Sequence, residues 1–196
     1  MQRCNLNTSD PLYIHYHDQE WGVSVFDDRK QFEFLLLESA QAGLSWITIL
    51  KKRENYRQAF ANFQPEIVAT FDDNKLEKLR QNSGIIRNGR KIRAAVNNAN
   101  RFLEIQREFG SFCNYLWGFV DFKPVVNRWK TTREIPAETE LSRVISKDMK
   151  SRGFQFLGPI IIYSHLQATG LVNDHVLNCF RWKQCQEIFS QFNSIK

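Results

Sequence analysis

The sequence Arg-Gly-Phe-Gln-Phe-Leu-Gly-Pro occupies residues 152–159, between two stretches in which apolar residues recur every three or four positions. This spacing is typical of helices, here near Glu138 to Arg152 and from Pro159 to Thr169. Two glycines around a short apolar turn predict a helical hairpin whose second helix begins with free backbone amides, an arrangement that can hold a phosphate. A plain corner between two helices is the alternative interpretation.

Apolar residues keep the same spacing along the rest of the chain, so we expect an all-α fold with no convincing pair of strands. Asp27 or Asp28 can cap a helix that runs to Ala42, and Gly43 can end it with a positive φ. Ser45 can cap the next helix, to about Asn62. Further helices are expected to begin near Pro65 and Asp72 and to span about residues 90–109, 111–120 and 172–180, with a loop at 123–136.

Four potential metal ligands lie near the two ends of the chain: Cys4, His17, His175 and Cys179. The last two are four residues apart, which on a helix places them on one face. Two thiolates and two imidazoles are a set that tetrahedral zinc prefers, and four protein ligands leave no open position for a water. The spacing therefore predicts one structural zinc ion that joins the two ends, although His15, Cys113 and Cys185 are alternative ligands.

The composition narrows the class of protein. The start of the chain has no apolar signal segment and no run is long enough to span a bilayer, which favours a cytosolic protein whose four cysteines stay reduced. Lys and Arg number 27 against 21 Asp and Glu, a net charge of +6, which indicates a polyanionic partner, with a merely basic, soluble surface as the alternative. Sixteen Phe and five Trp add rings that can stack on bases.

One carboxylate lies in an unusually apolar run. Glu38 directly follows the sequence Phe-Leu-Leu-Leu at residues 34–37. After Ser39 comes the sequence Ala-Gln-Ala-Gly-Leu-Ser-Trp at residues 40–46. Burying a charged carboxylate costs several kcal/mol, so Glu38 either faces outward or is held inside for a function. An ordinary outward glutamate is the simpler alternative.

Several motifs resemble one family over nearly the whole chain. They are Asp-Pro-Leu-Tyr at 10–13, Tyr-His-Asp-Gln-Glu-Trp-Gly at 16–22, Gln-Ala-Gly-Leu-Ser-Trp at 41–46, Lys-Lys-Arg-Glu-Asn-Tyr at 51–56, Gly-Ile-Ile-Arg at 84–87 and Gly-Leu-Val-Asn-Asp-His-Val at 170–176. These motifs resemble DNA-3-methyladenine glycosylase I, the zinc-containing branch of the helix-hairpin-helix DNA glycosylases. The resemblance implies one domain over residues 1–196, with two helical lobes around a cleft and the termini joined by zinc.

The resemblance also implies roles for individual residues. The zinc ligands would be Cys4, His17, His175 and Cys179. Glu38 would lie in the base pocket, Tyr16 and Trp46 would sandwich the flipped base, and Tyr13 and Ser164 would line the pocket. Gln41, Ala42, Gly43 and Leu44 would fill the gap in the duplex, and the hairpin with Gly153 and Gly158 would hold the DNA backbone. These roles match what base flipping requires, namely a stacking site for the base and a filler for the hole.

Two departures from the wider superfamily bear on the reaction. Many members carry a nucleophilic lysine just after the second hairpin glycine, whereas this chain has Ile160, so no strand-cutting lyase step is expected. Asn173 stands where the superfamily aspartate would be. On a helix, Asp174 would then be turned about 100° away. Methylation at N3 makes adenine cationic, so its bond to the sugar breaks with release of a neutral base and needs no strong acid.

We therefore predict a monomeric, monofunctional, cytoplasmic glycosylase that hydrolyses the N-glycosidic bond of 3-methyladenine in double-stranded DNA during base excision repair. Glu38 would favour the cationic base, and we expect several basic residues to contact phosphates: Lys51, Lys52, Arg53, Arg87, Arg90 and Lys91. A zinc-stabilised module that binds damaged DNA without cutting a bond is the alternative from another class.

Overall fold

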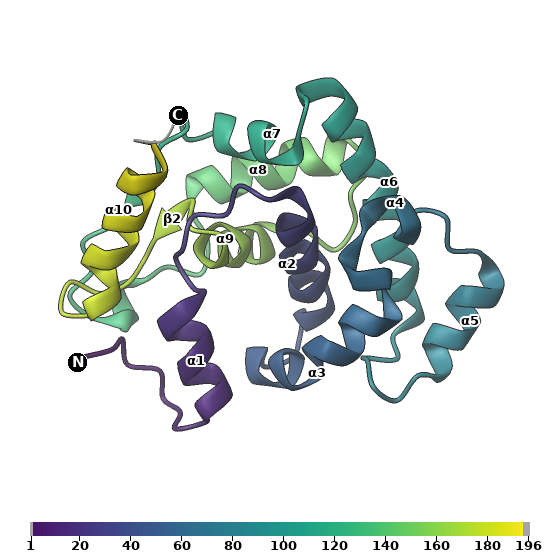
Figure 1. The fold of residues 1–196 in the computed structure, drawn as a ribbon, viewed down its shortest axis with the longest axis horizontal. Helices are drawn as coiled ribbons and strands as arrows, with labels where there is room; N and C mark the ends of the chain where they lie inside the picture. Colours follow the sequence, from purple (N-terminus) through teal and green to yellow (C-terminus); the bar gives the residue numbers. More distant parts are fainter. Residues whose placement is uncertain (1, 194–196) are drawn as a thin grey trace.

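A buried helix, α2 (Asp28–Gln41), lies in the interior of the protein in the computed structural model, which describes residues 2–193 (Figure 1). Residues 31–40 are all buried, including the polar side chains of Gln31, Glu33, Glu38 and Ser39. The side chain of Asp27 caps the first turn. Gly43, with φ +82°, ends the helix as predicted, since its backbone adopts a conformation that side chains rarely allow.

Nine further α-helices occur in the described residues, and α2 packs against four of them, α3, α6, α7 and α9. Their bounds are α1 (Pro11–Gln19), α3 (Trp46–Ala59), α4 (Pro65–Val68), α5 (Asp73–Gln81), α6 (Gly89–Phe109), α7 (Phe112–Gly118), α8 (Glu140–Ser151), α9 (Pro159–Ala168) and α10 (Phe180–Asn193), with 3₁₀ turns η1 (Ala61–Phe63) and η2 (Thr132–Glu134). The all-α prediction is confirmed. Strands β1 (Val125–Val126) and β2 (Val172–Asn173) add one short parallel pair that the sequence did not indicate.

Most predicted helix starts agree with the structure, and two differ in detail. Ser45 precedes α3 but bonds the Thr48 hydroxyl at 2.7 Å instead of capping the backbone. Asp28 serves another helix, because its carboxylate accepts from the amides of Phe112 and Cys113 at 2.8 Å. It thereby caps the first turn of α7 and ties that helix to the start of α2.

The predicted helix over residues 172–180 is wrong. Residues 172–173 form β2, His175 lies in irregular backbone, and Cys179 immediately precedes α10. The side chain of Asn173 explains part of this: it accepts from the His175 amide at 3.2 Å and donates to the Trp182 carbonyl at 2.9 Å. Such local bonds compete with helix formation.

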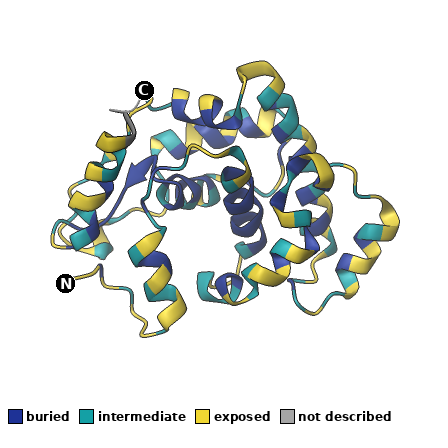
Figure 2. Ribbon diagram, in the orientation of Figure 1, coloured by how far each residue is buried: buried dark blue, intermediate teal, exposed yellow. Residues whose placement is uncertain are grey.

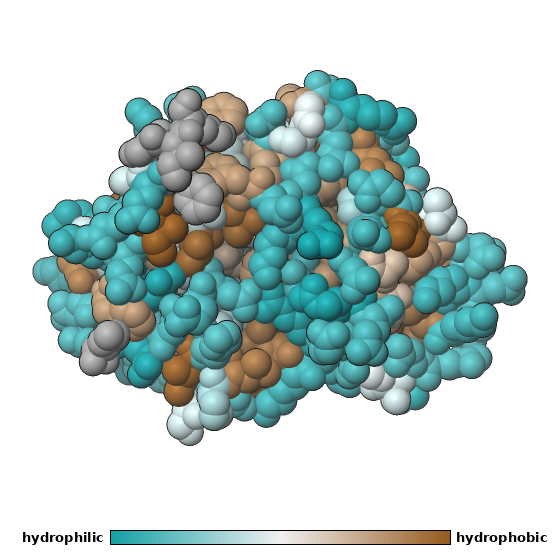
Figure 3. Space-filling view, in the orientation of Figure 1, coloured by the Kyte–Doolittle hydropathy of each residue, from teal (hydrophilic) through white to brown (hydrophobic). Residues whose placement is uncertain are grey.

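The two ends of the described chain lie on the same side of the molecule (Figure 1). The amide of Phe180, at the start of α10, donates to the Gln2 carbonyl at 2.9 Å. Buried residues concentrate in α2, α9 and β2 (Figure 2), while the face in Figure 3 is mostly hydrophilic with smaller hydrophobic groups. Among the helices described, none has the length and apolar character needed to cross a membrane. The predicted cytosolic location stays a prediction.

Candidate active site and metal centre

Four buried side chains from opposite ends of the chain meet in what we call the Cys₂His₂ cluster: Cys4, His17, His175 and Cys179. One donor atom from each lies within 4.8 Å of all the others. The His175 Nδ1 atom is 3.6 Å from the Cys4 sulfur and 3.5 Å from the Cys179 sulfur. A sulfur–nitrogen edge of about 3.5 Å is what a tetrahedral zinc ion with normal bond lengths would produce.

Both imidazoles of the cluster are oriented by an oxygen on their far side. His17 Nδ1 donates to the Asp18 carboxylate at 2.8 Å, which leaves Nε2 facing the cluster. His175 Nε2 donates to the Trp21 carbonyl at 2.9 Å, which leaves Nδ1 facing it. Such partners are usual behind metal-bound histidines. The neighbouring Gly22 allows this approach, because a Cβ there would lie 2.9 Å from the His175 ring.

The alternative ligands lie outside the cluster. His15 is exposed, whereas His17, two residues on, is buried and points inward. Cys113 lies on α7, with its sulfur 4.0 Å from the Val25 carbonyl. The donor set of the cluster therefore fits a metal ion without either residue, and without Cys185.

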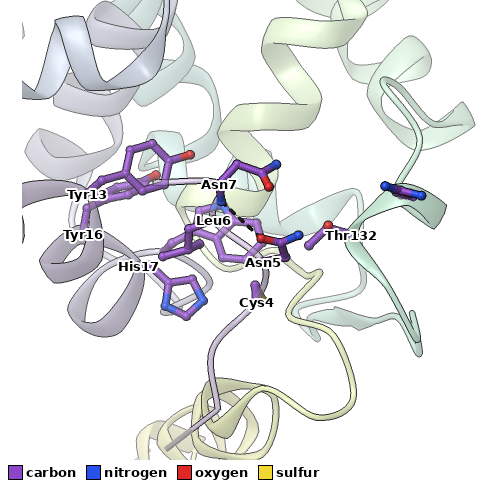
Figure 4. A pocket seen from close by; sticks show the side chains of 10 residues that line it. Cys4, Asn5, Leu6, Asn7, Tyr13, Tyr16, His17 and Thr132 are labelled. Carbon is purple, nitrogen blue, oxygen red and sulfur yellow. Dashed lines mark hydrogen bonds between the residues drawn. The ribbon is translucent and has the colours of Figure 1, made fainter. Parts of the chain in front are cut away.

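A second site lies beside the cluster and takes residues from α1, α2, α3 and α9. We call it the Glu38 pocket, a cavity of about 200 Å³ lined by Tyr13, Tyr16, Trp21, Glu38, Gln41, Trp46, Ser164 and Gln167. A neighbouring cavity of about 400 Å³ shares three of these aromatic residues (Figure 4). In that view His17 points towards Cys4 from the helix that also carries Tyr13 and Tyr16. The structure thus brings together all five residues that the sequence assigned to the base pocket.

Glu38 is 2% exposed, so the outward orientation is excluded. Its carboxylate lies 3.1 Å from Nδ1 of His165 on α9. The pKa of Glu38 is raised on balance, because burial raises it by more than the charge and hydrogen bond of His165 lower it. His165 is not among the residues predicted from the sequence, although a histidine within the apolar run of α9 is the same kind of signal as Glu38 within that of α2.

The aromatic rings of the pocket touch one another in this structure. The ring centroids of Tyr16 and Trp46 are 5.4 Å apart and their planes are tilted by 56°. A flat base between two parallel rings needs a wider gap, so the slot is closed. The Nε1 atom of Trp46 is buried and has no hydrogen-bond partner among the described residues. Burial also raises the pKa of Tyr16 well above its usual value, which keeps this phenol neutral.

The predicted wedge, residues 41–44, forms the turn after α2. Leu44 at its tip is 41% exposed, and nothing lies within 4 Å of a Cβ built on Gly43. The base of the turn is fixed from α6, because the Lys91 ammonium donates to the carbonyls of Ala40 at 2.9 Å and Ala42 at 2.6 Å. Lys91 therefore positions the wedge and is not free to bind a phosphate.

The hairpin between α8 and α9 has the predicted form. Gly153 adopts φ +89°, and Gly158 precedes α9 with no side-chain cap and open space around it. No side chain caps the first turn of α9, and Pro159 at its start has no backbone N–H. Ile160, in the expected lysine position, is 55% exposed at the second residue of α9.

Three further candidates for phosphate contact bind within the protein. Arg53 bonds the carboxylates of Glu20 and Glu33 at 2.7–2.8 Å. Burial acts to raise the pKa of Glu20, but Arg53 outweighs it and lowers that pKa to about 2. Lys52 donates to the Ser83 carbonyl at 3.0 Å, and Lys51, although exposed, pairs with Asp10 at 2.9 Å. Arg87 and Arg90 remain exposed.

Asp174 does not lie on a helix, so the rotation of about 100° expected for it is wrong. It is a buried junction whose carboxylate accepts four hydrogen bonds, from Asn127, Trp129, Tyr163 and Gln167. Gln167 also lines the Glu38 pocket. Asp174 therefore fixes the wall of the pocket, and Asn173 points away towards α10.

Comparison with known proteins identifies the class. The family described as methyladenine glycosylase matches residues 6–182. DNA-3-methyladenine glycosylase 1 of Escherichia coli is 49% identical over 179 residues, which cover 91% of this chain and 96% of that protein. DNA-3-methyladenine glycosylase of Haemophilus influenzae is 44% identical over 177 residues, which cover 90% and 96%.

Solved structures agree. A crystal structure of 3-methyladenine DNA glycosylase I superposes with a TM-score of 0.89 at 49% identity, covering 91% of this chain and 98% of that one. Another, in complex with 3-methyladenine, gives 0.89 at 38% identity, covering 92% and 97%. The fold is that of a base-excising DNA glycosylase. The chain belongs to the methyladenine glycosylase family, and the family predicted from the motifs is confirmed.

Proposed function

We propose that this protein excises 3-methyladenine from double-stranded DNA by hydrolysing the N-glycosidic bond, as a step of base excision repair, and leaves the strand intact. The observation that supports this most strongly is the Glu38 pocket, in which a buried carboxyl group lies beside two large aromatic rings. The names of the relatives agree with this reaction and with DNA as the substrate.

The residues in and beside the pocket would have different roles in binding the flipped base. Unstacking one base costs a few kcal/mol, which stacking on Tyr16 and Trp46 and filling of the gap by Leu44 would offset. Trp46 has to turn for the base to enter, and it loses no hydrogen bond in doing so because its Nε1 has no partner. Glu38 would then accept hydrogen bonds from the edge of the cationic base and stabilise its charge while the sugar bond loosens.

The Cys₂His₂ cluster would hold one structural zinc ion. The two sulfurs and two ring nitrogens suit zinc, and both imidazoles have the outer partners that orient metal ligands. The ion would join Cys4 to Cys179 and so hold α1 against the start of α10. Because α1 also carries Tyr13 and Tyr16, the metal would fix one wall of the Glu38 pocket.

DNA would bind as a duplex to a monomer of this chain. The open first turn of α9 and the exposed Arg87 and Arg90 would meet the backbone, and the wedge at residues 41–44 would enter the stack. Residues 1–196 would act as one glycosylase domain, since the pocket draws on α1 and α9 as well as α2 and α3. The four free cysteines agree with a reducing cytoplasm.

Release of free base from alkylated duplex DNA under single-turnover conditions tests the proposal. We expect 3-methyladenine to appear and the strand to stay uncut until alkali is added, because Ile160 offers no amine for a Schiff base. A product that borohydride traps on the protein would contradict the absence of lyase activity. Tight binding to damaged DNA without any release of base would favour the alternative, a zinc-stabilised DNA-binding module.

A further inference from the structure

His165 is a buried titratable residue to which the proposed mechanism gives no role. It lies on α9, is 1% exposed, and is held between two side chains of α2. Its Nδ1 atom is 3.1 Å from a carboxylate oxygen of Glu38, and its Nε2 atom is 2.8 Å from the amide oxygen of Gln31. The pocket carboxylate is thus the outer end of a buried chain of polar groups.

The inner end of this chain fixes the protons of the imidazole. The amide nitrogen of Gln31 donates to the Val25 carbonyl at 3.0 Å, so its oxygen must face His165. That oxygen only accepts, and His165 Nε2 therefore carries a hydrogen. One further proton lies between the two side chains, either on His165 Nδ1 or on the carboxyl group of Glu38. In the first case the pair is an imidazolium and a carboxylate, and in the second both groups are neutral.

Among the residues described, no cation other than His165 contributes to keeping Glu38 ionised. On α1 it is faced by the phenols of Tyr13 and Tyr16, and burial raises the pKa of both. On α3, Arg53 is bound to Glu20 and Glu33, and on α6, Lys91 is bound to backbone carbonyls. The sequences of α7 and η1 contain no charged residue. Among the side chains described, His165 makes the one ion pair of Glu38.

We propose that His165, aligned by Gln31, is a positioning residue that keeps Glu38 ionised and directed into the pocket, so that a carboxylate meets the cationic base. The inference rests on the proposed role of the pocket in binding 3-methyladenine. A neutral carboxyl group would present a donor to a base that is already positive. Once the sugar bond breaks, the base is neutral and loses its attraction to the carboxylate, which favours release of the product.

The dependence of the single-turnover excision rate on pH tests this inference. Burial raises the pKa of Glu38 and His165 lowers it, so His165→Asn, which keeps a donor but cannot be charged, should raise that pKa. Protonation of Glu38 would then begin at a higher pH. We expect the acidic limb of the rate profile to move to higher pH by about 1–3 units, with the rate recovering towards wild type in alkali.

A substitution at Gln31 tests the alignment of the imidazole. Gln31→Leu removes the acceptor and should move the limb to higher pH, by less than His165→Asn does. Ser39→Ala is the matched control, because this buried hydroxyl of the same helix bonds the Leu36 carbonyl and lies outside the pocket. Its profile should equal that of wild type.

Outcomes that overturn the inference differ from those that overturn the proposed function. If His165→Asn lowers the rate by the same factor at every pH, or not at all, His165 is merely structural. Should that variant fail to fold, a limb that stays at its wild-type position in Gln31→Leu would likewise overturn the inference. Wild-type protein that releases no base contradicts the proposed function instead. Glu38→Gln serves as the reference, since its rate should be low at every pH.

Discussion

The Cys₂His₂ cluster and the Glu38 pocket lie side by side and share α1, yet they use their polar groups in opposite ways. His17 points into the cluster, whereas its neighbour Tyr16 points into the pocket. In the cluster, four donor atoms face one another and each imidazole has a partner behind it. In the pocket, Trp46 has an unpartnered nitrogen and Glu38 is bonded to His165 alone among the described side chains.

The difference separates stability from function. A closed donor set can bind a metal tightly but has no position left for a substrate. A pocket with unpaired polar groups and a buried acid contributes less to the stability of the fold, and its polar groups gain partners when a base enters. Changes in the cluster should therefore affect folding first, and changes in the pocket should affect catalysis without affecting folding. Substitutions in each site can test that division.

The largest effect is expected from removing the metal. Apparent binding free energies of structural zinc are about 10–16 kcal/mol in small domains, so His175→Ala should lower the free energy of unfolding by several kcal/mol. Zinc analysis should give one ion per wild-type chain, and thermal unfolding should show the loss. Cys113→Ser is the control, since this cysteine is equally buried but lies on α7. Full zinc content and normal stability in His175→Ala would contradict the assignment.

The next largest effect is expected from the charge in the pocket. Glu38→Gln keeps the shape of the side chain and removes its charge, and one such electrostatic contact is typically worth about 100-fold or more in rate. We expect single-turnover excision to fall by that factor while zinc content and the unfolding midpoint stay unchanged. An unchanged rate would remove Glu38 from the mechanism, and a lost metal would show that pocket and cluster are not separable.

A smaller effect is expected from the stacking surface. Trp46→Ala should weaken capture of the base by about 1–3 kcal/mol, which corresponds to about 5- to 150-fold in affinity for an unreactive base analogue in duplex DNA. Trp46→Phe should retain part of this, because a smaller ring still stacks. If the Trp46→Ala and Trp46→Phe variants bind the analogue as tightly as the wild-type protein does, Trp46 is only a core residue.

The cluster and the pocket also differ in how far the sequence predicts them. Gly43, Asp27 and Pro159 act within a few residues of their own position, and each has the predicted effect on a helix end. The helix expected to carry His175 and Cys179 is wrong, because β2 and the side chain of Asn173 hold that segment in another conformation. The four side chains nevertheless lie together as predicted, since a donor set can be recognised from the sequence without knowing its backbone conformation.

The partner of Glu38 shows where a single sequence stops being informative. His165 is 127 positions away, and nothing in the spacing of either helix specifies that the two side chains meet. Two of the phosphate candidates are bonded within the protein for a related reason. In the sequence, Arg53 and Lys91 cannot be told from other basic residues on the surface. The fold, however, places two carboxylates beside Arg53 and two backbone carbonyls beside Lys91. The stacking and wedge roles of individual residues remain predictions.

The smallest effect is expected outside both sites, at Arg90. This exposed residue is the second of α6, and its guanidinium lies 5.8 Å from the ring of Phe156 in the hairpin, so a phosphate held by α9 would be close to it. Each phosphate contact contributes about 0.9 to the slope of log affinity against log salt concentration. Arg90→Ala should lower that slope by about this amount for DNA with an abasic site.

Lys51→Ala provides the comparison for Arg90, because Lys51 is also exposed but is paired with Asp10. Its substitution should change the slope less, since the ion pair already satisfies its charge. Neither change should alter zinc content or the pH profile of excision, because both residues lie outside the cluster and the pocket. Equal slopes for wild type and Arg90→Ala would mean that the DNA backbone follows a different path, in which the amides of the hairpin act without this charge beside them.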